Sequence, residues 1–149
     1  MRMQYPARVS RDEDGRYLVR FLDFGWGATD GVTLEEALGE AVDCLDELIA
    51  ATMERGEALP FPGDMLATNT WPISPSALIA AKAAVYCVQK EKGTRKTSLA
   101  QKMGKDEKFV RTLLDPHAGS RIQSIEDALR ALGKRLVISV EDDIARLNP

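Results

Sequence analysis

The sequence predicts an α+β protein made of two small domains with opposite charge. Residues 5–22 alternate apolar and polar side chains around an Asp14-Gly15 turn, which is the pattern of an antiparallel hairpin. An amphipathic helix follows, and after Ser74-Pro75-Ser76 the remaining pattern is mainly helical. Residues 1–75 carry a net charge of −8 and residues 76–149 a net charge of +5. This asymmetry indicates two modules with different partners.

The first domain is predicted to contain three strands before its helix. The alternating apolar residues of the first two strands are Tyr5, Ala7 and Val9, then Tyr17, Val19 and Phe21. Residues 25–29, which are rich in glycine, can form a third strand that ends in a turn at Asp30-Gly31.

A long helix is expected to open at Thr33 and to run to about Arg55, with Gly56 as its stop. Thr33 and Glu36 have the spacing of a capping box, in which the hydroxyl and the carboxylate each satisfy a free backbone N–H. Residues 69–73 then add a fourth strand, in which Pro72 suits an edge position. A sheet packed on this helix makes a two-layer domain over residues 1–73, and a linker over residues 74–76 follows.

The second domain, residues 77–149, is predicted to be mainly helical. Its first helix covers residues 77–92 and ends near Gly93, and a later helix, capped by Ser124, ends at Gly133. Leu136, Ile138 and Val140 alternate as a short final strand, which could pair across a dimer.

Between these helices, residues 96–114 have the pattern of a helix-turn-helix DNA reader. The small residue Ala100 allows two helices to cross closely, and Gly104 can adopt the left-handed conformation that ends the first helix. Asp106 can cap the second helix, and Val110 and Leu113 give that helix an apolar face. An ordinary helix pair would have the same spacing, so the charge of the segment has to decide between the two interpretations.

The charge favours DNA. Nine Lys or Arg residues and only three acids lie between Lys82 and Arg111, and such an excess attracts phosphate. Arg111 is the best candidate for a bidentate contact with guanine. Glu107 could accept a hydrogen bond from cytosine or cap the helix, and the cap is favoured. The predicted DNA-binding residues comprise the phosphate contacts Lys96, Thr97, Lys102 and Lys105 and the base-facing residues Lys108, Arg111 and Thr112.

The first domain has the opposite character, since nine acids and no Lys or Arg lie between Phe21 and Glu54. This run is either a solvated face that keeps the domain soluble or a surface that binds a basic partner and repels nucleic acid. Paired carboxylates could also hold two metal ions, but no histidine or other base accompanies them. We therefore expect no metal, no cofactor and no enzymatic activity.

The composition, 44% apolar and 29% charged, is ordinary for a soluble protein, and no apolar run is long enough to span a membrane. The N-terminus lacks the apolar core of a signal peptide. Cys44 and Cys87 are isolated and are expected to be reduced and partly buried, which indicates a cytoplasmic protein. The single histidine, His117, lies in a loop where it could contact a phosphate, and its isolation argues against a metal site or a hydrolase.

Both domains, in this order, resemble HicB-type antitoxins of bacterial toxin–antitoxin pairs. In the first half the resemblance rests on residues 5–9, 14–21 and 28–37 and on Asp23, which follow the family's order of strand, turn, strand, loop and helix entry. In the second half it rests on Leu99-Ala100, Gly104, Val110, Leu113 and residues 124–133, which resemble the family's Cro/repressor-like helix-turn-helix subtype.

The resemblance implies a fold and two partners. The first domain would be a partial RNase H-like β-β-β-α-β domain that covers a small mRNA-cleaving toxin of the HicA type, with Asp23, Trp26 and Asp30 among its contacts. The second domain would bind the promoter of its own operon as a homodimer or higher oligomer. Two departures fall in the loop that faces the toxin. The family's Phe-Pro-Asp reads Phe21-Leu22-Asp23, and Gly25-Trp26-Gly27-Ala28 replaces the family's cysteine.

Two other functions fit parts of the sequence. One is a stand-alone transcription regulator whose first domain senses a ligand or only dimerises. The other, the least favoured, is a metal-dependent nuclease with a degenerate RNase H-like site that uses Asp23 or Asp30.

Overall fold

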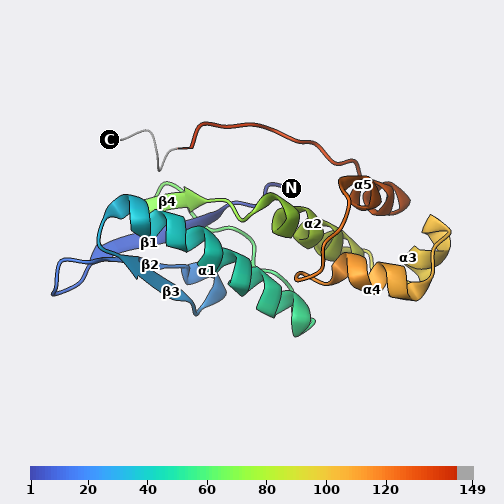
Figure 1. Ribbon diagram of the computed structural model, residues 1–149, viewed down its shortest axis with the longest axis horizontal. Helices are drawn as coiled ribbons and strands as arrows, with labels where there is room; N and C mark the ends of the chain where they lie inside the picture. The colour runs from blue at the N-terminus through green and yellow to red at the C-terminus, as the bar shows by residue number, and fades with distance from the viewer. Residues whose placement is uncertain (144–149) are drawn as a thin grey trace. The chain divides into compact units, whose positions relative to one another are not determined.

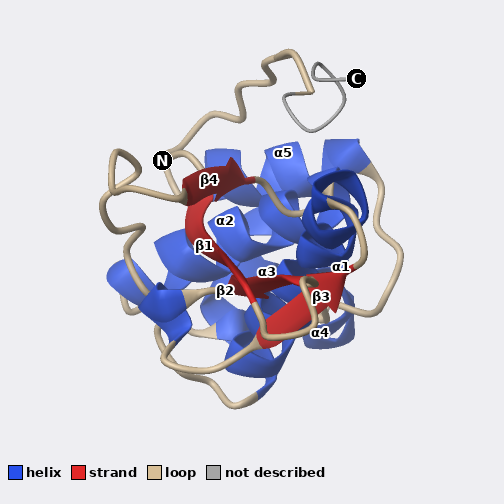
Figure 2. Ribbon diagram, turned by 90° about the vertical axis from the view of Figure 1, so that its left-hand side faces the viewer, coloured by secondary structure: helices blue, strands red, loops and turns tan. Residues whose placement is uncertain are grey.

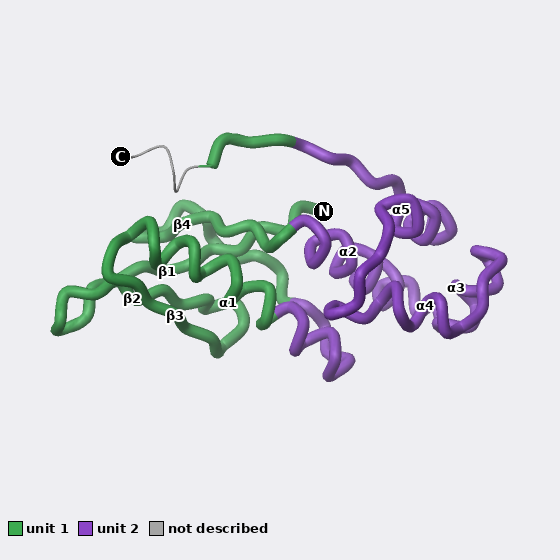
Figure 3. The backbone as a smooth tube through the Cα atoms, viewed as in Figure 1, with its two compact units in different colours: residues 1–48, 60–76, 140–149 green, residues 49–59, 77–139 purple. Residues whose placement is uncertain are grey.

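The computed structural model describes residues 1–143, which contain a four-stranded sheet and five α-helices. They group into two compact units, coloured separately in Figure 3. Within the described residues, unit 1 comprises residues 1–48, 60–76 and 140–143, and unit 2 comprises residues 49–59 and 77–139. The α+β class predicted from the sequence is confirmed.

Unit 1 is built around an antiparallel sheet with the strand order β3-β2-β1-β4 (Figure 2). The strands are β1 (Tyr5–Arg11), β2 (Tyr17–Arg20), β3 (Ala28–Gly31) and β4 (Thr70–Ile73). In the central strand β1, Val9 pairs with Val19 of β2, and Tyr5 pairs with Ile73 of β4. Pro72 lies in the edge strand β4, as predicted. Proline has no backbone N–H, so it suits a strand that has a neighbour on one side only.

Helix α1 (Leu34–Glu54) follows β3, and its part in unit 1 lies along one face of the sheet (Figure 1). The predicted capping box is present at its start. The Thr33 hydroxyl accepts a hydrogen bond from the Glu36 N–H at 3.1 Å, and the Glu36 carboxylate accepts one from the Val32 N–H at 2.9 Å. The buried core joins alternate strand residues to one stripe of the helix, as the periods of 2 and 3.6 require. Its members are Tyr5, Ala7, Val9, Val19, Phe21, Ala37, Leu38, Ala41, Leu45 and Leu48.

The third strand is predicted over residues 25–29 but forms over Ala28–Gly31, so Asp30-Gly31 belongs to the strand and not to a turn. The chain before it forms a short 3-10 helix, η1 (Leu22–Phe24), which Gly25 closes at a φ of 72°. Gly27 lies against α1, where a Cβ would come within 2.6 Å of Leu48. These glycines therefore serve a turn and a close approach, which a strand pattern read along the sequence does not reveal.

Unit 2 contains the helices α2 (Ala77–Glu91), α3 (Lys96–Met103), α4 (Glu107–Leu114) and α5 (Ile122–Ala131). Helices α3 and α4 have the predicted bounds. The prediction that Ser124 caps the last helix is wrong, because α5 begins at Ile122 with Arg121 in the N-cap position. Ile125 and Leu129 are buried with either start, so their spacing cannot fix where the helix begins.

The predicted final strand over Leu136, Ile138 and Val140 does not form in the described chain, where residues 132–143 have no regular secondary structure. A strand needs a hydrogen-bonded neighbour, and the only described sheet consists of β1 to β4. Three β-branched side chains of this segment are consequently exposed: Val137 to 76%, Ile138 to 70% and Val140 to 95%.

Cys44 and Cys87 are free and half-buried, as predicted, and burial raises the pKa of the Cys87 thiol to about 11. His117 lies in the predicted loop after α4, where its Nε2 is 3.0 Å from the Glu54 carboxylate. Within residues 1–143, no helix is long and apolar enough to cross a membrane.

Candidate functional site

The first candidate site is the pair of short helices α3 and α4 in unit 2. Gly104, at a φ of 65°, ends α3, and the backbone turns into α4 after Asp106. The Asp106 carboxylate accepts a hydrogen bond from the Phe109 N–H at 2.8 Å, which is the predicted N-cap. Val110 and Leu113 are buried, as predicted, together with Leu99 and Ala100 of α3. Gly104 and Asp106 therefore determine the turn between the two helices, and the buried apolar residues pack α3 against α4.

The side of α4 opposite its buried face is polar and positively charged. A spacing of 100° per residue puts Lys108, Arg111 and Thr112 opposite Val110 and Leu113, and all three are exposed. The four predicted phosphate contacts, Lys96, Thr97, Lys102 and Lys105, are exposed as well. In the turn before α4, the ammonium of Lys105 lies 5.2 Å from the centre of the Phe109 ring of α4, an arrangement in which the ring can attract the cation.

Glu107 does not cap α4, contrary to the prediction. Asp106 already fills that role, and the Glu107 carboxylate instead accepts a hydrogen bond from Arg111 Nη2 at 2.6 Å. Both side chains are partly exposed, so this i,i+4 pair contributes only about 0.3–0.5 kcal/mol. Arg111 can therefore exchange Glu107 for a stronger acceptor at small cost.

Lys82 belongs to the positive stretch in the sequence but not to the charged surface. Its side chain is fully buried, and its ammonium donates hydrogen bonds to the carbonyl oxygens of Thr112, Leu113 and Asp115 at 2.8–3.1 Å. These carbonyls lie at the C-terminal end of α4, where helical backbone lacks internal donors and a cation is favoured. Burial lowers the pKa of Lys82, and the nearby Asp115 opposes this effect.

Sequence reasoning missed this role of Lys82, although a signal was present. Lys82 lies three and four residues before Val85 and Tyr86, and both are buried. A charged residue on the buried side of a helix indicates a specific partner inside the protein. Lys82 is thus a positioning residue for the end of α4.

A groove runs between α4 and α5 and extends the positive surface beyond the predicted residues. Met103, Phe109 and Leu113 contribute apolar walls. Its basic members are Lys102, Lys105, Lys108, Arg121 and Arg130, and its acidic members are Asp106 and Asp127. Arg121 and Arg130 come from α5 and its N-cap and were not predicted, because their nearness to α4 depends on how the helices pack.

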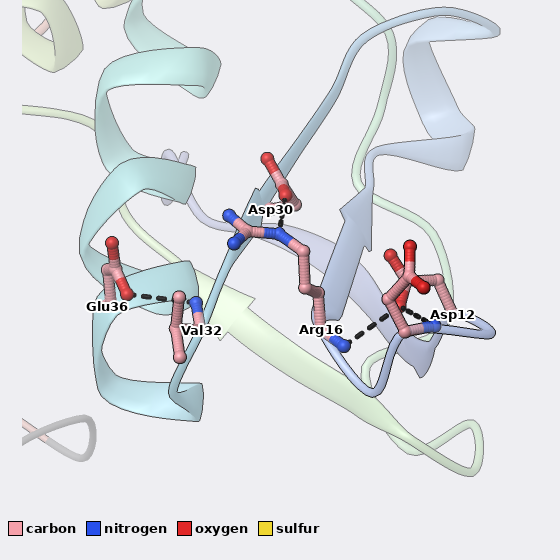
Figure 4. A network of polar contacts seen from close by, with 6 residues as sticks. Asp12, Arg16, Asp30, Val32 and Glu36 are labelled. Atoms are coloured by element: carbon pink, nitrogen blue, oxygen red, sulfur yellow. Dashed lines mark hydrogen bonds and ion pairs between the residues drawn. The ribbon is translucent and has the colours of Figure 1, made fainter.

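The second candidate site lies in unit 1, where the structure gives the three predicted residues different surroundings. Asp23 is half-buried, and its carboxylate accepts a hydrogen bond from the Gly63 N–H at 2.9 Å. Asp30 forms an ion pair with Arg16, and this contact raises the Arg16 pKa (Figure 4). Trp26 is 48% exposed. Asp23 and Asp30 therefore have structural partners within the unit. The exposed part of Trp26 offers apolar surface to the solvent.

A loop that sequence reasoning did not single out carries the most exposed aromatic side chain of unit 1. The Tyr5 hydroxyl donates to the Pro60 carbonyl at 3.0 Å, and Asp23 holds Gly63. Phe61 lies between these two attachment points and is 95% exposed. The prolines on either side of Phe61 restrict its backbone further, so the ring is held outward at little conformational cost.

Unit 1 also exposes acidic side chains on α1. Glu35, Glu40, Asp43 and Glu47 on α1 are exposed, whereas Asp46 is half-buried and accepts a hydrogen bond from the Ser76 N–H at 2.9 Å. In the described part of the chain, no three His, Cys, Asp or Glu side chains are grouped in a way that could hold a metal ion.

Comparison with known proteins places this architecture in a family. Residues 4–84 match the family described as HicB-like antitoxin of bacterial toxin–antitoxin systems. The chain belongs to the HicB-like antitoxin family. It is 27% identical to Antitoxin HicB of Escherichia coli over 90% of this chain and 96% of that one. It is 32% identical to Antitoxin HicB of Pseudomonas fluorescens over 74% of this chain and 76% of that one.

The family match covers all four strands, α1 and the first half of α2, so it rests on the sheet unit and not on α3 and α4. Similarity to individual HicB antitoxins extends further. Antitoxin HicB 1 of Photorhabdus laumondii is 29% identical over 93% of this chain and 88% of its own length. The similarity of this protein to the antitoxins of Escherichia coli and Photorhabdus laumondii therefore extends over both of its units.

Proposed function

We propose that this HicB-like antitoxin binds and occludes a small mRNA-cleaving toxin of the HicA type and represses its own operon by binding promoter DNA. Unit 1 would be a partial RNase H-like toxin-binding domain, and α2 to α5 would form a Cro/repressor-like helix-turn-helix domain. The repressor would be cytoplasmic and a homodimer, because a helix-turn-helix reader spans two half-sites of an operator.

The observation that carries the DNA-binding part is the exposed face of α4. Its three predicted base-facing residues, Lys108, Arg111 and Thr112, lie opposite the buried face, and the α4–α5 groove beside them is mainly basic. A helix presented in this way by a preceding short helix is the part that enters the major groove in helix-turn-helix readers. The surrounding lysines and arginines would neutralise phosphates.

The toxin-binding part is supported by the family and by the chemistry of unit 1. A toxin that cleaves mRNA needs a basic surface to hold its substrate, so an acidic partner can occupy the same surface. Phe61 and Trp26 would supply the apolar contacts and the acids of α1 the charge complementarity. Asp23 would act through the loop that it holds, and Asp30 through its pair with Arg16.

Co-expression with the neighbouring gene tests the proposal most directly. We expect a short basic protein to co-purify with this chain, to cleave mRNA when expressed alone and to be inactive in the complex. A gel shift on the DNA upstream of the two genes tests the second part. If the DNA shifts but no basic neighbour binds, the stand-alone regulator is the correct function. If the toxin is neutralised but no DNA binds, the repressor assignment is wrong.

A further inference from the structure

The face of the sheet that points away from α1 carries two arginines that face each other. Successive side chains of a strand point to opposite faces, and Val9 and Val19 point into the core under α1. Arg8 and Arg20 therefore point to the other face, where the register sets them directly opposite one another on β1 and β2. Both are exposed. Directly opposed side chains have Cβ atoms about 4.5–5.5 Å apart, and like charges in such a pair destabilise a sheet unless an anion lies between them.

The other arginines of unit 1 have partners. Among its described residues, unit 1 contains five arginines and no lysine. Three of these arginines contact another side chain, in the pairs Arg2–Glu141, Arg11–Tyr17 and Arg16–Asp30. Arg8 and Arg20 form no hydrogen bond, ion pair or ring contact with another described residue. These two cations are therefore free to bind an external anion.

The neighbours of this pair add a hydroxyl group and no net negative charge. One row of outward-facing side chains crosses all four strands and comprises Thr70, Arg8, Arg20 and Ala28. Neighbouring strands lie about 4.8 Å apart, so one hydroxyl and two guanidinium groups lie side by side. Asp30 is the only acid that faces outward on the four described strands, and Arg16 neutralises it. Guanidinium and hydroxyl groups are donors that match the oxygens of a phosphate.

We propose that Thr70, Arg8 and Arg20 form a second DNA contact of this antitoxin, which binds backbone phosphates beside the operator. The inference rests on the proposed function, because it requires DNA that α4 already holds. Once unit 2 is bound, unit 1 is tethered to the same duplex, and the tether raises the DNA concentration around the arginines. A contact that is weak by itself is then populated. Phosphate contacts of this kind strengthen binding without reading the sequence.

The charges of unit 1 favour DNA over the toxin as the partner of this face. The proposed toxin is basic, and two arginines repel a basic surface. DNA is attracted by the arginines and repelled by the exposed acids of α1, which include Glu40, Asp43 and Glu47. Because the part of α1 in unit 1 lies along the other face of the sheet (Figure 1), these acids point away from a duplex that touches the arginines. The acids of α1 would thus remain open to the toxin while the arginines hold DNA.

Duplexes of two lengths test the contact with the full-length chain. The short duplex contains only the two half-sites, and the long one extends them by about 10 bp, one helical turn, on each side. Glutamine removes the charge of an arginine and keeps most of its aliphatic stem. We expect Arg8→Gln and Arg20→Gln each to weaken binding of the long duplex by at least about threefold. Each should also lower the slope of log K against log salt by about 1. Binding of the short duplex should be unchanged.

Arg11→Gln is the matched control. Arg11 lies on the same strand, but its guanidinium lies 4.5 Å from the centre of the Tyr17 ring, so the variant should bind both duplexes as wild type does. Urea unfolding checks the fold of each variant. Arg8→Gln and Arg20→Gln should be at least as stable as wild type, because each removes one of two opposed like charges. All three variants should neutralise the toxin normally.

The outcomes separate this inference from the proposed function. If wild type binds neither duplex, the repressor assignment and the second contact are both wrong. If wild type binds both duplexes and the Arg8 and Arg20 variants lose nothing on the long one, the second contact is absent and the repressor assignment stands. Loss of toxin neutralisation in these variants, with DNA binding unchanged, would assign the arginine face to the toxin and overturn the proposal.

Discussion

Arg111 and Lys102 carry the same charge but are expected to contact different parts of DNA. Arg111 lies in the middle of the exposed face of α4, whereas Lys102 lies at the end of α3. We expect Arg111→Ala to cost about 1–3 kcal/mol of operator binding and to relax sequence preference, because a bidentate guanine contact is lost. Fluorescence anisotropy with operator and random DNA would measure both effects.

Lys102→Ala is the matched control for this prediction. The loss of a phosphate contact should weaken operator and random DNA about equally and reduce the slope of log K against log salt by about 1. Should Arg111→Ala bind both DNAs as wild type does, α4 would not be the reading helix. Should Lys102→Ala alter sequence preference, Lys102 would be a base contact.

A second prediction at the scale of one residue concerns the contribution of Lys82 to stability. Lys82→Met leaves three carbonyls at the end of α4 without their donor, and we expect a loss of about 1–3 kcal/mol in the free energy of unfolding. The folded pKa of Lys82 lies below its ordinary 10.5. Between these two pKa values the unfolded chain binds more protons, so the advantage of wild type over Lys82→Met should grow as pH rises toward 10.5.

Urea unfolding at pH 8 and pH 10 would measure this difference. Lys90→Met is the control, because Lys90 is an exposed lysine in the same helix. Its effect should stay within about 0.5 kcal/mol. Equal losses for the two variants would show that the hydrogen bonds of Lys82 do not stabilise α4.

At the scale of an element, we expect the substitution of glycine by alanine to have opposite effects on stability at two positions. Gly104 ends α3 at a φ of 65°, and Gly39 lies inside α1 with φ in the ordinary range. A Cβ would meet nothing within 4 Å at either position, so only backbone conformation differs. Gly104→Ala should destabilise its unit by about 1–2 kcal/mol. Gly39→Ala should stabilise α1 by about 0.5–1 kcal/mol. Thermal unfolding of both variants would decide, and a shift in the same direction would contradict the argument.

The elements also show which parts of the fold the sequence could predict. The bounds of α3 and α4 followed from Gly104 and Asp106, because a stop and a cap act within one turn of the chain. The bounds of β3 did not, because Gly27 is required by Leu48 of α1, which is distant in the sequence. The exposed face of α4 could be predicted from periodicity. The burial of Lys82 depends on carbonyls about 30 residues away, and the predicted strand at Ile138 has no partner strand within residues 1–143.

At the scale of the whole molecule, the two proposed functions should be separable, because their candidate residues lie in different compact units. Phe61→Ala removes the exposed ring of unit 1, and we expect it to weaken toxin binding by more than about 1 kcal/mol, as for an aromatic anchor. The same variant should leave DNA binding unchanged. Arg111→Ala should give the converse result, with weak operator binding and normal toxin neutralisation.

Leu66→Ala provides the control that makes this last test specific. Leu66 is 94% exposed in the same segment as Phe61, and its N–H donates to the carboxylate of Asp64, two residues before it. If exposure alone made a toxin contact, both variants would weaken binding alike. We expect the loss for Phe61→Ala to be several times larger, since Tyr5 and Asp23 hold its loop on both sides before the toxin arrives. Isothermal titration of each variant with the purified toxin would measure the difference. Equal losses would mean that the two attachment points of the loop do not contribute to recognition.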